Sequence, residues 1–332
     1  MARSSTSAGL VVAVLAAATF GTSGAFVKPL LEAGWSPAAA VTVRALVGGL
    51  ALTPVALVLL RGRWDAFWRG RWRVLGMALI GVAGTQLVYF AALQRIPVGT
   101  AILVEYMAPL LLVAVAWVMT RHTPAAVVLV GSVVALVGLV LVVSPGGTTG
   151  VDPLGLGFAL AAMVGCAGYY VIAARPSDGL PAVALAAGGL VVGGIALGLV
   201  GLAGLVPFMA TADDVVLFGS VVSWWVPILV VGLLGTAVAY AASITASGML
   251  GSRLASFAGL LEVVAATFYA WLLLGERLTV PQLIGGALIL VGIGFVRSER
   301  RDAAEPIVAP EGPAGVVDQQ VPAALLRRHD HG

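Results

Sequence analysis

The stretch Gly84–Ala91, GTQLVYFA, occurs again 151 positions later as Gly235–Ala242, GTAVAYAA. Glycine, threonine, tyrosine and alanine recur at the same spacing in both copies. Three further pairs of identical residues lie 154 positions apart: Trp117 and Trp271, Gly131 and Gly285, and Gly138 and Gly292. The chain is therefore predicted to consist of two related halves.

The composition of the chain indicates a membrane protein. Of the 332 residues, 60% are hydrophobic and 10% are charged, whereas soluble domains carry about 25% charged residues. We therefore expect the lipid bilayer to surround most of the chain. Two related hydrophobic halves in one chain are typical of secondary transporters, which place one site between two similar bundles.

The formal net charge of +3 does not point to nucleic acid as a partner, because most arginines lie in short loops beside apolar runs and form no basic face. Arginine and tryptophan alternate over residues 61–73, a pattern also known from single-strand binding proteins. Between two membrane spans, this segment is predicted to anchor in the lipid headgroups. The single cysteine, Cys166, lies in an apolar run and is predicted to be a packing residue.

Charged or Pro/Gly-rich breaks divide the chain into ten apolar runs, each long enough to cross a bilayer. The first run is predicted to remain uncleaved, because it is too long for a signal peptide and lacks a clean cleavage site. The ten predicted spans are 9–28, 37–60, 74–93, 97–120, 124–143, 154–174, 181–206, 225–246, 253–274 and 279–296.

With ten spans, the cationic residues divide unequally between the two faces of the membrane. Fourteen of the eighteen fall on the side of the termini, three (Lys28, Arg95 and Arg277) fall on the other side, and Arg44 lies inside a span. The positive-inside rule then predicts that both termini are cytoplasmic.

Each half contains five spans, which is an odd number, so the second half is expected to enter the membrane from the opposite face. The predicted fold class is an all-α membrane protein with ten transmembrane helices arranged as two inverted five-helix repeats. The first repeat is assigned to residues 1–146 and the second to residues 147–296. Residues 297–332 are predicted to form a disordered cytoplasmic tail.

Three ionisable residues, Arg44, Glu105 and Glu262, fall well inside predicted spans. A charge at the bilayer centre costs at least roughly 2.5–3.5 kcal/mol, so each should face a partner or a wet cavity. In the structural interpretation, Arg44 and Glu105 form an ion pair and Glu262 bonds within a helix junction. In the functional one, a carboxylate lines the pathway and binds a substrate amine or carries a proton, and Arg44 holds a substrate carboxylate.

Further polar candidates lie nearby, each either a site residue or a helix–helix contact: Gln86, Tyr89, Tyr106, Tyr169, Tyr170 and Tyr240. Lys28 closes the first span and is predicted to extend outward to solvent, with an inward-facing cationic site as the alternative. Pro109 lies within the fourth span, one turn beyond Glu105, and is predicted to kink it.

Signatures of catalysis are missing from the sequence. It contains no His-Glu-x-x-His motif, catalytic Ser/His/Asp arrangement or phosphate loop. His122 is the one histidine before the tail, which carries His329 and His331, so no metal or other cofactor is expected. We predict that the chain is not an enzyme. The alternatives are a passive channel or facilitator, a membrane-embedded enzyme and an obligate structural subunit.

The second half of the chain also carries residues that are typical of a known family. The run Leu261–Gly292, with Glu262, Trp271 and Gly275-Glu276-Arg277, resembles EamA-type members of the drug/metabolite transporter superfamily. Val263 stands where that family usually has proline. The resemblance extends over about residues 9–296 and includes Gly21–Lys28 in the first span, Arg44 in the second, and Glu105, Pro109 and Trp117 in the fourth. The first copy has Arg121-His122-Thr123 where the second has Gly-Glu-Arg.

The resemblance implies ten helices in an inverted repeat, cytoplasmic termini and export of a small metabolite, such as an amino acid, across the plasma (inner) membrane. It leaves open whether a proton or a counter-solute drives the flux, and whether the protein is a monomer or a homodimer.

Overall fold

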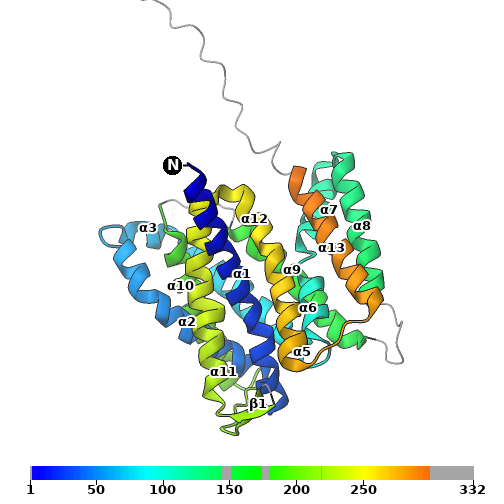
Figure 1. The fold of residues 1–332 in the computed structure, drawn as a ribbon. Coiled ribbons are helices and arrows are strands. Elements are labelled where there is room, and N and C mark those ends of the chain that lie inside the picture. The colour runs from blue at the N-terminus through cyan, green and yellow to red at the C-terminus, as the bar shows by residue number, and fades with distance from the viewer. Residues whose placement is uncertain (1, 144–150, 174–178, 218, 300–332) are drawn as a thin grey trace, which may run out of the picture.

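The computed structural model describes residues 2–143, 151–173, 179–217 and 219–299 (Figure 1). Residues 300–332 of the predicted disordered tail, with His329 and His331, lie outside the described residues, as does the link at 144–150. The described part is mostly helical, and its long helices lie side by side in a bundle.

The first half begins with a long helix that carries Lys28 near its end. Two short helices, α3 and α4, then connect α2 to the segment that contains the first of the two Gly-Thr copies. These copies are the matched stretches Gly84–Ala91 and Gly235–Ala242. The elements of this half are α1 (Ala2–Glu32), α2 (Pro37–Leu59), α3 (Trp64–Arg69), α4 (Arg71–Gly76), η1 (Met77–Gly84), α5 (Thr85–Leu93), α6 (Val98–Glu105), α7 (Ala108–Thr120) and α8 (Ala126–Val143).

The second half includes a β-hairpin that the sequence did not predict. Its strands pair antiparallel, with Val215 opposite Val222. Trp35, just after α1, donates from Nε1 to the backbone oxygen of Thr211 at 2.9 Å, which ties this loop to the first half. The elements of this half are α9 (Pro153–Ala173), α10 (Ala182–Leu202), β1 (Val215–Leu217), β2 (Ser220–Val222), α11 (Trp225–Leu229), η2 (Val230–Val238), α12 (Ala239–Leu274) and α13 (Val280–Glu299).

The Gly-Thr copies mark a π-helical segment in each half, η1 and η2. In both, the threonine hydroxyl donates to the carbonyl five residues earlier: Thr85 to Ile80 at 2.6 Å and Thr236 to Val231 at 2.9 Å. Donor and acceptor are both offset by 151 positions between the halves. The sequence repeat is thus also a repeat of backbone structure, of a kind that is frequent at functional sites.

The fourth predicted span is broken in two. Helix α6 ends at Glu105, Tyr106 and Met107 follow, and α7 begins with Pro109 in its first turn. Proline has no N–H to bond the carbonyl four residues earlier, here that of Glu105, and its ring crowds that carbonyl. The break therefore lies directly beside Glu105.

The end of the eighth predicted span, from Ala239 on, is joined to the ninth in the single helix α12, with no break at Val263. Phe20 contacts Tyr240 with ring centroids 5.2 Å apart, and a Cβ at the adjacent Gly21 would lie 2.8 Å from Ala265. Tyr240 and Ala265 would be about 37 Å apart in a straight helix. Since both lie beside the same turn of α1, α12 must fold back on itself, and Figure 1 shows it turning over near the N-terminus.

Seven helical stretches are long and apolar enough to cross a membrane, and three shorter apolar helices, 126–142, 260–274 and 280–295, accompany them in the described part of the chain. Large apolar side chains face outward, including Val58, Met119 and Leu199, which are 59%, 78% and 62% exposed. Such surfaces fit lipid rather than water. The protein is a multi-pass membrane protein.

Helices α8 and α13 pack through glycines at matched positions of the repeat. A Cβ at Gly138 would lie 2.5 Å from the backbone oxygen of Gly285, and one at Gly292 would lie 2.4 Å from that of Gly131. The lower-numbered glycine of α8 thus meets the higher-numbered glycine of α13, so the two helices are antiparallel. Gly131 matches Gly285 in the repeat, and Gly138 matches Gly292. The contact of Gly138 with Gly285 therefore corresponds to the contact of Gly292 with Gly131.

Candidate functional site

Arg44 connects the two Gly-Thr copies across the middle of the bundle. It projects from α2 and is 7% exposed. Its Nε donates to Thr236 Oγ1 at 3.0 Å and its Nη1 to Gln86 Oε1 at 2.5 Å, while its guanidinium lies 5.5 Å from the centroid of the Phe90 ring. Gln86 follows the threonine of the first copy and Thr236 belongs to the second, so one cation contacts both halves.

The structure corrects the ion pair suggested for Arg44 and Glu105. Among the described residues, no salt bridge joins them, and the hydrogen-bond partners of the guanidinium are the neutral oxygens of Gln86 and Thr236. The sequence placed Arg44 and Glu105 at a similar depth, but depth does not determine which side chain a helix presents. Arg44 keeps N–H groups that bond none of the described residues.

Two carboxylates lie near this cation. Glu105 ends α6 and is 9% exposed, and Glu262 lies on the returning part of α12 and is partly exposed. Both are within electrostatic range of Arg44 and of each other. The phenol of Tyr106, in the break between α6 and α7, is an electrostatic neighbour of Glu262. The break therefore places a residue that interacts with the second half directly after Glu105.

Tyrosines surround the charged groups. Tyr169 and Tyr170 on α9 contact each other edge to face, with ring centroids 5.5 Å apart. Tyr170 is an electrostatic neighbour of Tyr106, and Tyr169 one of Tyr240. The structure thus assembles one polar centre from both halves, which contains nine of the ten predicted residues: Arg44, Gln86, Tyr89, Glu105, Tyr106, Tyr169, Tyr170, Tyr240 and Glu262.

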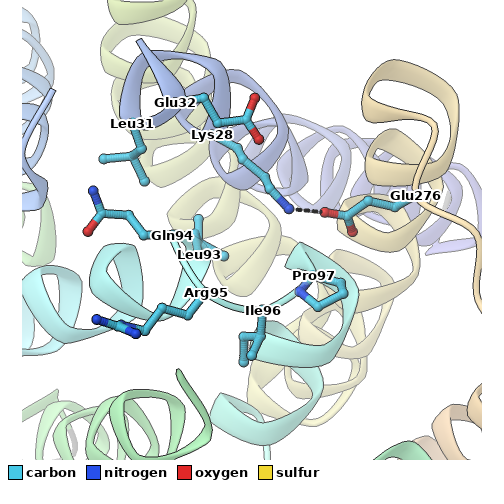
Figure 2. A pocket seen from close by; sticks show the side chains of 9 residues that line it. All are labelled: Lys28, Leu31, Glu32, Leu93, Gln94, Arg95, Ile96, Pro97 and Glu276. Atoms are coloured by element: carbon cyan, nitrogen blue, oxygen red, sulfur yellow. Dashed lines mark hydrogen bonds and ion pairs between the residues drawn. The ribbon is translucent and has the colours of Figure 1, made fainter. Parts of the chain in front are cut away.

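Lys28, the tenth predicted residue, lies apart from the polar centre and does not extend freely to solvent as expected. Its Nζ donates to Glu276 Oε1 at 2.6 Å, and the side chains of the pair are 18% and 13% exposed. A pocket of about 340 Å³ opens beside the pair (Figure 2). Its lining comes from the end of α1, from residues 93–97 and from Glu276.

Sequence reasoning missed two residues of these arrangements. Thr236 was quoted as part of the self-match but not considered as a partner for a charge. Glu276 appeared within the family motif without a role. A search for clusters of three or more histidine, cysteine, aspartate or glutamate residues found no candidate metal site in the part of the chain that the structure describes.

A multi-pass helical protein whose polar centre is shared by two matched halves has the architecture of a membrane carrier. The model of the EamA-like transporter family matches residues 7–144 and again residues 153–298. The chain therefore belongs to the EamA-like transporter family, and it is a membrane transporter of small solutes.

A search of solved structures supports the fold. One crystal structure aligns with 90% of this chain and 99% of its own chain, with a TM-score of 0.59 and 19% sequence identity. At that identity, the likeness concerns the fold alone. No curated protein matches the chain significantly.

Proposed function

We propose that this protein is a secondary transporter that exports a small metabolite, an amino acid or a related solute, across the plasma membrane by alternating access. The observation that carries this proposal is the position of Arg44. A buried cation bonded to neutral groups from both halves, with N–H groups left over, is suited to an anionic group of a substrate held between those halves. Export is the direction that the family resemblance implies.

The proposal includes ten spans in two inverted repeats. It is supported by the return of α12, which turns one long helix into two crossings, and by the three shorter apolar helices. The glycine contacts between α8 and α13 support it further. Matched helices that pack antiparallel are related by a two-fold axis perpendicular to them, which for membrane helices lies in the membrane plane.

The proposed orientation places both termini in the cytoplasm and the Lys28 end of the bundle outside. Its support is the unequal distribution of cationic residues between the two faces. In this orientation, the pocket beside Lys28 and Glu276 opens to the exterior.

The polar centre offers complementary groups for a zwitterion. Arg44 would bind a carboxylate through its unused N–H groups. Glu105 or Glu262 would bind an amine or carry a proton, and the tyrosines would shape the space around the substrate. The coupling partner, a proton or a counter-solute, follows from which of these roles the carboxylates have.

The first experiment identifies a substrate and separates a carrier from a channel. Metabolites exported by cells with and without the protein are compared without preselection, and the solutes that differ are tested with the purified full chain in liposomes. A carrier gives saturable uptake that is accelerated by unlabelled substrate inside the vesicles. Linear uptake without such acceleration would establish a passive pore, and no flux of any solute would favour a structural subunit.

The second experiment tests the site. Glu105→Gln and Glu262→Gln are expected to reduce flux or to change its pH dependence, whereas Asp214→Asn, on an exposed loop, should leave both unchanged. Arg44→Gln should weaken transport of a carboxylate substrate far more than transport of its decarboxylated analogue. Unchanged flux and unchanged pH dependence in both glutamate variants would reject a coupling role.

A further inference from the structure

Glu276 contacts the first half at two points although it belongs to the second. Its Oε1 accepts from Lys28 Nζ at 2.6 Å, and both carboxylate oxygens accept from the backbone N–H of Val98, at 3.1 and 3.0 Å. Lys28 is near the end of α1, and Val98 is the first residue of α6. One carboxylate therefore joins three segments at the Lys28 end of the bundle. Figure 2 shows its bond with Lys28.

The local sequence explains this geometry at both ends. Gly275 adopts φ +66°, a left-handed conformation that ends α12 and turns the chain so that Glu276 points across the bundle. Pro97 precedes α6 and provides no side-chain cap, so the N–H of Val98 lacks a partner within its own helix. A carboxylate at this position satisfies that donor and interacts favourably with the helix dipole.

The contact is accessible from one side. The pocket beside it is lined by charged groups and by a floor residue, Leu93, which is 1% exposed. Water that enters this pocket reaches the Lys28–Glu276 pair, whose side chains are partly exposed. An ion pair in this setting can hold the neighbouring helices together. It can also separate, because water from the pocket hydrates both charges when the pair breaks.

Helix α6 connects this contact to the polar centre. It begins at Val98, which Glu276 caps, and ends at Glu105, beside the break that contains Tyr106. Tyr106 in turn is an electrostatic neighbour of Glu262 on α12, the helix that Glu276 follows. The segment that carries Glu105 is thus bonded to the second half at its first residue and interacts electrostatically with the second half just after its last.

The matched turn in the first half lacks such a contact. Arg121, 154 positions before Gly275, is also left-handed, with φ +57°. His122 takes the place of Glu276, but its ring Nδ1 lies 2.8 Å from the backbone oxygen of Thr120, so the side chain folds back onto its own helix. The carboxylate contact is therefore a feature of one end of the bundle.

We propose that Glu276 is the latch of the pathway at the Lys28 end: its bonds to Lys28 and to the Val98 N–H hold that end closed, and both must break for the polar centre to open there. Glu276 is a positioning residue in this scheme, because it acts through α6. The proposal rests on the proposed alternating access, since a latch requires a pathway that opens and closes.

The first test measures opening without transport. In a Cys166→Ala background, Leu93→Cys reports access to the pocket floor, and its rate of reaction with a thiol reagent is measured on the full chain in detergent. Adding Glu276→Ala should raise that rate about tenfold, because the variant loses the hydrogen bonds of the carboxylate to Lys28 and to the Val98 N–H, and the pocket then opens more often. Glu276→Gln, which keeps an acceptor for Val98, and Lys28→Met, which keeps the cap, should each raise it less.

Two controls separate a latch from general destabilisation. Arg277→Gln changes the exposed neighbouring charge and should leave the rate at Leu93→Cys unchanged. A second reporter, Ile289→Cys, is fully buried in α13 and should react no faster in any latch variant. A wild-type rate at Leu93→Cys in Glu276→Ala, or an equal rise at both reporters, would overturn the proposal.

The second test locks the contact. Lys28→Cys with Glu276→Cys, in the Cys166→Ala background, is bridged by a short bifunctional methanethiosulfonate, which attaches to each cysteine through a reducible disulfide, and is assayed for flux in liposomes. Bridging should stop flux, and reduction should restore it to the level of the unbridged protein. Full flux through bridged protein would refute the latch. If the wild type carries no solute but the labelling rates still shift as expected, the proposed function fails while the latch stands.

Discussion

The turns that follow α7 and α12 have the same backbone and different chemistry. Both are left-handed, at Arg121 and at Gly275, but only the second is followed by a carboxylate that reaches the other half. The Gly-Thr copies differ in the same way. Thr85 and Thr236 bond the same relative carbonyl, and Thr236 additionally accepts from Arg44.

These differences show that duplication preserved backbone structure while the side chains diverged. A carrier built from identical halves would have equivalent inward- and outward-facing states. Within the described residues, one central cation, Arg44, and a carboxylate contact at one end make the two ends of this bundle inequivalent. That inequivalence is what a transporter needs if it is to rest in one state and respond to substrate from one side.

The largest expected effect comes from breaking what the halves still share, the glycine contact between α8 and α13. In Gly285→Leu, the new side chain would clash with Gly138, because a Cβ at position 285 lies 2.5 Å from the backbone oxygen of Gly138. We expect a loss of about 1–3 kcal/mol or more, since a backbone atom cannot move aside easily. The measurement is the melting temperature of the purified protein in detergent.

The matched variant Gly138→Leu should lower the melting temperature by a similar amount, because the contact is the same with the halves exchanged. Gly157→Leu serves as the control, since a Cβ there meets nothing within 4 Å. Equal stability of Gly285→Leu and Gly157→Leu would show that the two helices do not pack as described.

The next effect separates the two threonines. Thr236→Val removes a hydrogen bond from a buried cation and should reduce flux about tenfold or more, whereas Thr85→Val should change it less than about threefold. Thr236→Ser keeps the hydroxyl and should retain most of the flux. The measurement is initial uptake into liposomes at matched protein levels. Equal losses at both threonines would mean that the bond to Arg44 does not matter for transport.

Much of the membrane architecture was predictable, because bilayer thickness imposes a length on every apolar run. The runs near 37–60, 154–174 and 279–296 each match one helix, α2, α9 and α13, and the family match confirms the resemblance. The count of ten spans and the inversion of the repeat stay predictions. Spans 8 and 9 illustrate the difficulty, because the Gly- and Ser-rich stretch before Arg253 predicts a break between them, whereas helix α12 continues through it.

The candidate site was predictable as a set of residues but not as a set of bonds. A charge within a span is rare enough to be noticed, which drew attention to Arg44, Glu105 and Glu262. Which partner each one has depends on the rotation of the helices about their axes, and a π-helical segment changes that rotation. The bond between Arg44 and Thr236 therefore could not be derived from spacing, and neither could the contact of Lys28 with Glu276 across 248 positions.

A smaller effect is expected at the two left-handed turns. Gly275→Ala places a Cβ in a conformation that disfavours it, and should destabilise the protein by about 1–2 kcal/mol. Arg121→Gly removes the same strain from the first half and should raise the melting temperature slightly. Thermal unfolding in detergent measures both. A destabilising Arg121→Gly beside a neutral Gly275→Ala would contradict the assigned backbone.

The smallest effect concerns an exposed ion pair near the latch, which contrasts with the partly buried Lys28–Glu276 pair. Asp152 lies 3.4 Å from Arg95, and the side chains are 38% and 42% exposed. The pKa of Asp152 is lowered, chiefly because the backbone N–H of Gly155 donates to its carboxylate, with a further contribution from Arg95. A lowered pKa in the folded state means that the ionised form stabilises the fold.

That contribution is present above the pKa of an unfolded aspartate and is lost as the pH falls through the lowered pKa. Wild type should therefore melt slightly above Asp152→Asn near neutral pH, and the two curves should converge in acid. Added salt should reduce the part of this difference in melting temperature that is due to Arg95, because exposed charges are screened. A difference that persists unchanged in acid would assign the effect to the amide side chain itself rather than to the charge of Asp152.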